Sequence, residues 1–349
     1  MSIKIEGRSI GPGHPPFVIA EMSGNHNQSL DRALAIVEAA AQAGAHAIKL
    51  QTYTADTMTL NARGGSFEIN DPNSLWSGQN LHDLYKKAYT PWEWHASIME
   101  RARALGLICF SSPFDETAVD FLEELGAPAY KIASFENNHL PLIAKAAATR
   151  KPLIISTGMA TLAELEMAVV AAREAGCKEL ILLKCTSTYP STPENTNIST
   201  IPHLRSLFNV EVGLSDHTMG VGVAVASVAL GASVVEKHFT LARADGGVDS
   251  AFSLEPSEFK SLVIETQRAW ESLGQVRYGP SKAESKSMVF RRSIYVASDI
   301  FEGDVFNDSN LRIVRPGDGA PPWLLQKLIG CKARRDYKAG TPLYLKDLF

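Results

Sequence analysis

The chain has 349 residues, of which 45% are hydrophobic and 21% are charged, and its formal net charge is −4. This composition is typical of a folded globular protein with a large core and argues against disorder. The slightly acidic balance, without a dense lysine or arginine run, argues against a nucleic-acid partner. An anionic small substrate stays open, because a few buried lysines can bind one phosphate whatever the surface charge.

The cysteines and the N-terminal residues bear on the compartment in which the protein folds. The four cysteines lack the close spacing of a zinc site, and four in a chain of this length do not make a disulfide scaffold. The opening MSIKIEGRSIG has no apolar signal core, and no run of about 18 uncharged apolar residues follows it. We therefore expect a reduced, cytoplasmic protein without a membrane partner.

Short apolar runs recur along the chain, and a polar turn and a helical pattern follow each of them. Runs that do not alternate suit strands buried on both faces, as in a parallel sheet. The clearest helices are 30–43 and 162–175, which are rich in alanine and end at Gly44 and Gly176. The expected strands are 17–20, 47–50, 107–110, 129–133, 153–155, 180–183, 210–214 and 233–235.

Eight such units predict an α/β fold, a closed (β/α)8 TIM barrel, which alone takes roughly 250 residues. An open doubly wound sheet needs fewer strands and a glycine-rich nucleotide turn, and the sequence has no GxGxxG. Residues 53–90 are too long for an ordinary βα loop and predict a segment that covers the substrate.

A domain boundary is expected after the last barrel helix, near residues 256–273. The polar stretch 274–290, with its glycine and proline, predicts a linker. We therefore place a catalytic barrel at 1–280 and a small domain at 281–349, built from short strands and glycine turns. Its size gives only a marginal core, so we expect it to dock on something.

Polar side chains stand where the eight strands end, which is where the reacting groups of a (β/α)8 barrel lie. Burying them costs free energy unless they are paired, so we expect one polar pocket. Lys49, Lys131 and Lys184 among serines would suit a small anion, although each alone could equally be a solvated strand end. In chain order these residues are Glu21, Asn25, His26, Lys49, Gln51, Ser111, Ser112, Lys131, Ser134, Glu136, Ser156, Thr157, Lys184, Ser187, Ser215, Asp216, His217, Glu236, Lys237 and His238.

Two histidines, His217 and His238, end the seventh and eighth strands, which are neighbours in a closed barrel. Their imidazoles could reach one divalent ion. Two nitrogen ligands leave the other positions to water and substrate, which suits Mn²⁺ or Mg²⁺ better than a structural zinc ion. The turn DGGVDS would place Asp249 beside the ion; a plain glycine turn is the alternative.

These segments resemble the N-acetylneuraminate synthase family of sialic acid synthases through nearly the whole chain. The resemblance is carried by FVIAEMSGNHNQ (17–28), IKLQTY (48–53), FSSPFD (110–115), YKIASFE (130–136), STGMA (156–160), CTSTYPSTP (185–193), GLSDHT (213–218) and EKHFT (236–240). The tail, with RRSIYVASDIFEGDVF and NLRIVRPGDG, resembles the family's small antifreeze-like (SAF) domain. The resemblance implies a homodimer that exchanges this domain, so that Arg315 reaches the partner's barrel; ice binding is the alternative.

The resemblance also implies the chemistry, which is the joining of phosphoenolpyruvate to an amino sugar with loss of phosphate. His217 and His238 would hold Mn²⁺, or else Mg²⁺ or Co²⁺, which polarises the sugar aldehyde. Glu136 and Asp249 would stabilise positive charge at C2 or orient water, with Glu21 nearer the sugar. Phosphoenolpyruvate would be held by Lys49, Ser112, Lys131, Ser134, Ser156, Ser187 and Ser215. The sugar would contact Asn25, Gln51, Tyr189 and Arg315.

Residues 49–60, 75–94 and 249–256 most resemble the branch of the family that makes pseudaminic acid. The acceptor would then be 2,4-diacetamido-2,4,6-trideoxy-L-altrose; an N-acetylmannosamine-type sugar, giving N-acetylneuraminate or legionaminate, is the alternative. A synthase of the seven-carbon acid of aromatic biosynthesis would need further cationic clamps for a sugar phosphate. A non-catalytic sugar- or ice-binding module would release no phosphate.

Overall fold

The computed structural model describes residues 3–344 and 346. The chain forms two compact units, one up to Gly274 and one from Gln275 onward. This division lies at the start of the stretch that we expected to be a linker. Within the described part of the chain, no helix combines the length and the apolar character needed to span a membrane.

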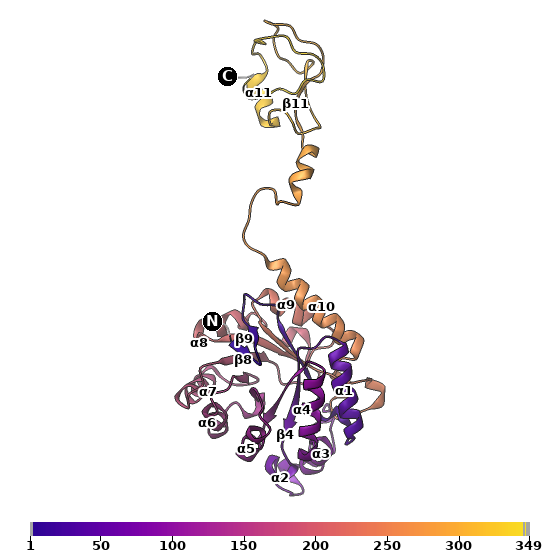
Figure 1. Cartoon of the computed structure of the whole chain (residues 1–349), viewed down its shortest axis with the longest axis vertical. Helices are drawn as coiled ribbons and strands as arrows, with labels where there is room; N and C mark the ends of the chain where they lie inside the picture. The colour runs from indigo at the N-terminus through magenta and orange to yellow at the C-terminus, as the bar shows by residue number, and fades with distance from the viewer. Residues whose placement is uncertain (1–2, 345, 347–349) are drawn as a thin grey trace. The chain divides into compact units, whose positions relative to one another are not determined.

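The first unit is a closed barrel of eight parallel strands with helices around its outside (Figure 1), as predicted. The strands are β3 (Phe17–Glu21), β4 (Ala47–Thr52), β5 (Ile108–Pro113), β6 (Tyr130–Ile132), β7 (Leu153–Ser156), β8 (Leu180–Cys185), β9 (Glu211–Asp216) and β10 (Val234–His238). The helices after the strands are α1 (Leu30–Gln42), α4 (His95–Ala104), α5 (Glu116–Glu124), α6 (Leu140–Ala148), α7 (Leu162–Glu174), α8 (Thr200–Phe208), α9 (Gly222–Ala229) and α10 (Pro256–Leu273).

Side chains alternate along each strand between the barrel interior and the layer of helices. In β3, for example, Phe17 and Ile19 pack inside the barrel, whereas Val18 and Ala20 pack against the helices. The interior is apolar at the amino ends of the strands. Towards the carboxyl ends the same inward positions carry polar residues, beginning with Glu21 and with Lys49, which is its partner in the parallel ladder.

The predicted strands are right in number and place, but seven of them run further towards their carboxyl ends than expected. β10, for example, reaches His238 rather than residue 235. The reason is that the last inward positions are polar and interrupt the apolar run, although their backbones continue the ladder. A hairpin that was not predicted precedes the barrel. It consists of β1 (Ile3–Ile5) and β2 (Arg8–Ile10), and its isoleucines pack with the apolar residues of the barrel interior.

Residues 53–90, which we call the lid segment, are more regular than expected. They contain α2 (Ala55–Met58) and α3 (Leu81–Ala88). The side chain of Asn80 caps α3 by accepting from the backbone N–H groups of His82 and Asp83. The segment shows little regular periodicity because its helices are short and α3 buries only His82, Leu84 and Ala88.

The second unit has a small apolar core of its own. Its strands β11 (Ser293–Val296) and β12 (Leu311–Val314) pair antiparallel, and the helix α11 (Leu325–Leu328) supplies Leu328 to the core. Ile294, Phe306 and Tyr337 are also buried in this core. Short strands joined by turns were the expected pattern for this part of the chain.

Candidate active site

A cavity of about 730 Å³ opens at the carboxyl ends of the barrel strands. Its deep part is formed by strand ends and its outer part by the lid segment and by the loops after β6, β8 and β10. Of the predicted site residues, it is lined by Glu21, Lys49, Gln51, Lys131, Ser134, Glu136, Ser187, Tyr189, Ser215, His217, His238 and Asp249. The sequence-predicted pocket is therefore present as a single basin.

Two lysines and two glutamates form a buried charged cluster on the floor of the cavity. Lys49 Nζ pairs with Glu21, and it lies 3.9 Å from Glu236 Oε2. Lys131 Nζ lies 3.1 Å from Glu236 Oε1, which also accepts from the Ser215 hydroxyl at 3.1 Å. Each of the four charged residues is at most 4% exposed, so their charges are tolerated only because they compensate one another.

The two glutamates of this cluster respond differently to burial. Burial raises the pKa of Glu21, and the neighbouring Lys49 offsets only part of that shift. Burial also opposes ionisation of Glu236, but Lys131 and Lys49 together lower its pKa below the ordinary value. Burial likewise opposes the charge of Lys49, yet Glu21 and Glu236 raise its pKa overall. Glu236 is therefore the glutamate of this cluster that favours the ionised form, and its carboxylate lies within 3.9 Å of both ammonium groups.

Hydroxyl groups surround the ammonium groups. Ser112 Oγ accepts from Lys49 Nζ at 3.2 Å, and the hydroxyls of Ser187 and Ser134 are 2.8 Å apart. Gly158 makes room for that serine pair, because a Cβ at this position would lie 2.5 Å from Ser134 Cβ. Its φ of +48° also disfavours any other residue. Ammonium and hydroxyl donors in this arrangement suit a phosphate and a carboxylate.

The two histidines lie side by side on the cavity wall. The ring centroids of His217 and His238 are 5.3 Å apart, and Asp249 Oδ2 is 3.8 Å from His238 Nδ1. The carbonyl oxygen of Thr186 accepts from His217 Nδ1 at 2.9 Å, so that in the neutral ring the lone pair is on Nε2. His238 Nδ1 is buried without a hydrogen-bond partner. An orphaned imidazole nitrogen beside a carboxylate and a second imidazole fits a divalent cation.

The donor set is small, since no group of three or more His, Cys, Asp or Glu residues in the described chain is arranged to hold a metal. The two imidazoles could therefore hold a cation whose other ligands are water and substrate. Burial lowers the pKa of His238 well below its ordinary value and keeps the ring neutral. For His217, burial has the same effect, but the adjacent Cys185 outweighs it and raises the pKa.

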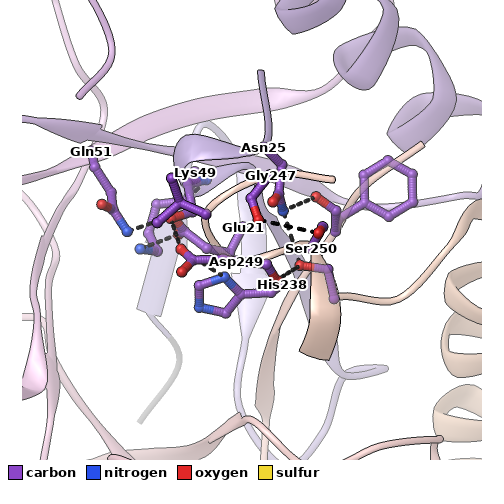
Figure 2. A network of polar contacts seen from close by, with 12 residues as sticks. Glu21, Asn25, Lys49, Gln51, His238, Gly247, Asp249 and Ser250 are labelled. Atoms are coloured by element: carbon purple, nitrogen blue, oxygen red, sulfur yellow. Dashed lines mark hydrogen bonds and ion pairs between the residues drawn. The ribbon is translucent and has the colours of Figure 1, made fainter. Parts of the chain in front are cut away.

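Asp249 is fixed by the loop that carries it. Its carboxylate accepts from the Ser23 hydroxyl, and its backbone carbonyl accepts from the Ser253 hydroxyl at 2.7 Å. Figure 2 shows Gln51, Lys49 and Glu21 on one side of Asp249 and His238, with Asn25, Gly247 and Ser250 on the other. The DGGVDS turn is therefore part of the site.

Asn25 supports this loop and does not line the cavity. Its side-chain amide donates to the Phe239 carbonyl oxygen and to the Ser253 hydroxyl, both at 2.9 Å. The interpretation of Asn25 as a sugar contact gives way, on this geometry, to a structural one. Asn25 turns away from the cavity because the chain turns after β3, and Ser23 lines the cavity instead.

Two residues that were expected to bind phosphoenolpyruvate, Ser112 and Ser156, also stand outside the cavity lining. Ser112 lies behind Lys49, and the buried Ser156 hydroxyl has no hydrogen-bond partner. Arg315 belongs to the second unit, where it follows β12.

Lys184 was expected among the anion-binding lysines, and that expectation is wrong. It alternates outward between the inward Leu183 and Cys185, and its ammonium donates to the Cys185 carbonyl oxygen at 2.8 Å.

Lys237 and Asp216 also point outward, where they form a buried ion pair behind the histidines. Lys237 Nζ lies 2.7 Å from Asp216 Oδ2 and donates to the carbonyl oxygen of Thr218. Asp216 Oδ1 accepts from the Thr218 backbone and hydroxyl at 2.9 and 2.8 Å. Both side chains of the pair are at most 2% exposed. The pair therefore holds the turn that carries His217 against the strand that carries His238.

Replacing Lys237 with methionine is expected to lower the free energy of unfolding by about 3–5 kcal/mol, because Asp216 then stays buried and uncompensated. Guanidinium unfolding followed by circular dichroism measures the loss. Lys145→Met is the matched control, since the Lys145–Asp120 pair is solvent-exposed and its loss should have little effect. Equal losses in the two variants would contradict the assignment.

Several lining residues were not assigned a role from the sequence. Glu236 was noted only as a polar residue at a strand end. It lies two residues before His238 on β10, and side chains two apart on a strand point to the same face, so Glu236 also faces inward. Burial would raise the pKa of the Cys185 thiol, but His217 and Lys131 lower it to about 7. Ser23 and Trp76 lie in segments that carry the resemblance, but no role was assigned to them, because only the fold brings them to the cavity.

Comparison with known proteins matches residues 36–278 to the NeuB family and residues 291–348 to the SAF domain. A pseudaminic acid synthase of Campylobacter jejuni is 45% identical over 95% of this chain and 96% of its own. An N,N'-diacetyllegionaminic acid synthase of the same species is 35% identical over 92% of this chain and 97% of its own. The crystal structure of an N-acetylneuraminic acid synthetase from Leptospira borgpetersenii has a TM-score of 0.73 and 32% identity, over 82% of this chain and 95% of that one.

Proposed function

Because the chain belongs to the NeuB family, the phosphoenolpyruvate-dependent synthases of nonulosonic acids, we propose that it condenses phosphoenolpyruvate with 2,4-diacetamido-2,4,6-trideoxy-L-altrose. The products would be pseudaminic acid and phosphate. The observation that carries the proposal is the single basin lined by Lys49 and Lys131 together with His217 and His238. The acceptor is supported by the higher identity to the pseudaminic acid synthase, 45% against 35% for the legionaminic acid synthase.

The lysines and serines of the floor would bind phosphoenolpyruvate. Lys49 and Lys131 supply point charges for the phosphate and the carboxylate, and the hydroxyls of Ser134, Ser187 and Ser215 supply directional donors. Glu236 shares both ammonium groups in the free protein. Before substrate binds, Glu236 would hold the two ammonium groups in position. The oxygens of phosphoenolpyruvate would then compete with Glu236 for these groups.

His217 and His238 would hold a divalent cation, Mn²⁺ by preference, which when bound polarises the aldehyde oxygen of the open-chain sugar. The chain's own residues position the sugar. Asp249 lies beside His238, and Tyr189 packs over His217 with ring centroids 4.5 Å apart. Gln51, whose amide donates to Glu21 at 3.1 Å, reaches the cavity from β4.

Carboxylates would then stabilise the positive charge that develops at C2 of phosphoenolpyruvate. As C3 attacks the aldehyde carbon, positive charge develops at C2, and water adds there before phosphate leaves. Glu136 faces the cavity, with Oε2 buried and without a partner. Burial raises the pKa of Glu136 to about 7, against the lowering effect of Lys131. A carboxylate with this pKa can stabilise the cation or orient the water near neutral pH.

Phosphate release tests the acceptor. The protein is incubated with phosphoenolpyruvate and Mn²⁺, and with either the altrose derivative or N-acetylmannosamine. We expect phosphate release and a nonulosonic acid of the pseudaminic mass with the altrose derivative, at a kcat/KM well above that for N-acetylmannosamine. The reverse preference would overturn the acceptor, and no release with either sugar would overturn the proposed function.

The second unit is proposed to complete the site across a homodimer, with Arg315 contacting the sugar bound by the partner. Arg315→Ala and His217→Ala should then each be inactive alone. After mixing and subunit exchange, a hybrid dimer would contain one intact site, so about a quarter of wild-type activity should return. A mixture that stays inactive although hybrids form, as seen by mass spectrometry of the intact dimers, would contradict domain exchange.

A further inference from the structure

A second hollow of about 550 Å³ lies next to the active-site cavity. Four residues line both spaces: Leu75, Trp76, Leu84 and Val248. They come from the lid segment and from the DGGVDS turn. The second hollow therefore shares part of its wall with the cavity.

Trp76 has the largest side chain of this shared wall, or partition. Its indole Nε1 donates to the Val248 carbonyl oxygen at 2.9 Å, which ties the lid segment to the turn that carries Asp249. On the cavity side, its ring centroid lies 6.0 Å from that of Tyr189, which in turn packs on His217. Tyr189 therefore packs against both the indole of Trp76 and the ring of His217, and Tyr189 and His217 would face the sugar.

We propose that Trp76 determines acceptor specificity by limiting the length of the sugar's N-acyl groups, and that the hollow behind it is a subsite for a longer acyl chain. The inference rests on the proposed function, because an acyl group must point towards Trp76. The hollow is lined by the apolar residues Leu75, Leu84 and Ala251, which would contact the acyl chain, and also by the polar residues Asn27, Gln28, Gln79 and Lys87. An alkyl chain is the group that such apolar residues stabilise.

Trp76→Ala removes the indole and should join the two spaces. The probes are the diacetamido sugar and two analogues, in which the acetyl group at either the C2 or the C4 nitrogen is replaced by butanoyl. The quantity measured is the ratio of kcat/KM for each analogue to kcat/KM for the diacetamido sugar. We expect Trp76→Ala to raise this ratio at least about tenfold for one of the two analogues, equivalent to about 1.4 kcal/mol.

Two further variants complete the design. Leu75→Ala also opens the partition, and because Leu75 is 47% exposed its removal should not prevent folding, so the test survives an unstable Trp76→Ala. Leu60→Ala is the control, because Leu60 lies on the same segment, is 68% exposed and lines neither space. Its ratio should equal that of the wild type.

The proposal is overturned if Trp76→Ala and Leu75→Ala leave both ratios within about twofold of the wild type, since acyl length is then set elsewhere. Wild-type turnover of the diacetamido sugar tests the proposed function separately. If the wild type prefers N-acetylmannosamine, the acceptor is wrong, and the same butanoyl substitution on that sugar tests the partition. The two failures are therefore distinguishable.

Discussion

Replacing His217 with alanine is expected to lower phosphate release by roughly 10³-fold, because a cation at this site supplies several kcal/mol of charge stabilisation. His217 is buried, packs against Tyr189 at 4.5 Å and is held by the Thr186 carbonyl oxygen. Its loss leaves His238 as a single imidazole, which is too few ligands for tight binding. Phosphate release and Mn²⁺ binding by calorimetry should therefore fall together.

The control for this variant is His203→Ala, which removes an exposed histidine from α8 and should leave both measurements unchanged. Circular dichroism separates loss of the site from loss of the fold. Wild-type rates in His217→Ala with a chelator present would show that neither the histidine nor a metal has the role proposed for it.

Replacing Glu136 with glutamine is expected to reduce kcat by roughly 10²-fold and to remove one limb of the pH profile. Burial raises the pKa of Glu136 to about 7, so the group is largely neutral below that pH. Only the ionised form can stabilise positive charge at C2 or accept a proton from water. In the wild type, kcat should therefore rise as the pH increases through about 7.

Glutamine keeps the size of the side chain but cannot ionise, so the rise should be absent from the Glu136→Gln profile. Glu174→Gln, on the exposed face of α7, should reproduce the wild-type profile. A Glu136→Gln protein whose kcat still rises through the same pH range would assign that limb to another group, such as Glu21, whose pKa burial also raises.

The barrel could be predicted from the sequence because its determinants are local. Each strand is a short apolar run buried on both faces, and each helix carries its own buried stripe, as in α1 with Ala33, Ile36, Val37 and Ala40. The strand-end rule then located most of the cavity, because parallel strands of a closed barrel must end at the same mouth. Lys49, Lys131, His217 and His238 meet there for this reason.

Strand ends alone do not say which way a side chain points, and the errors follow from that. Lys184 has the residue type of an anion ligand but alternates outward, whereas Glu236 alternates inward between the two lysines. The period of two would have separated these cases. Trp76 and the second hollow could not be predicted, since they depend on how the lid segment lies against the turn before Asp249.

The proposed reaction in this basin joins C3 of phosphoenolpyruvate to the sugar and breaks the C–O bond at C2. Mass spectrometry of both products, made from phosphoenolpyruvate labelled with ¹⁸O at the bridging oxygen, tests it most directly. We expect a sugar acid that contains the three phosphoenolpyruvate carbons and released phosphate that carries the ¹⁸O. Unlabelled phosphate, or labelled phosphate without the new sugar acid, would contradict it.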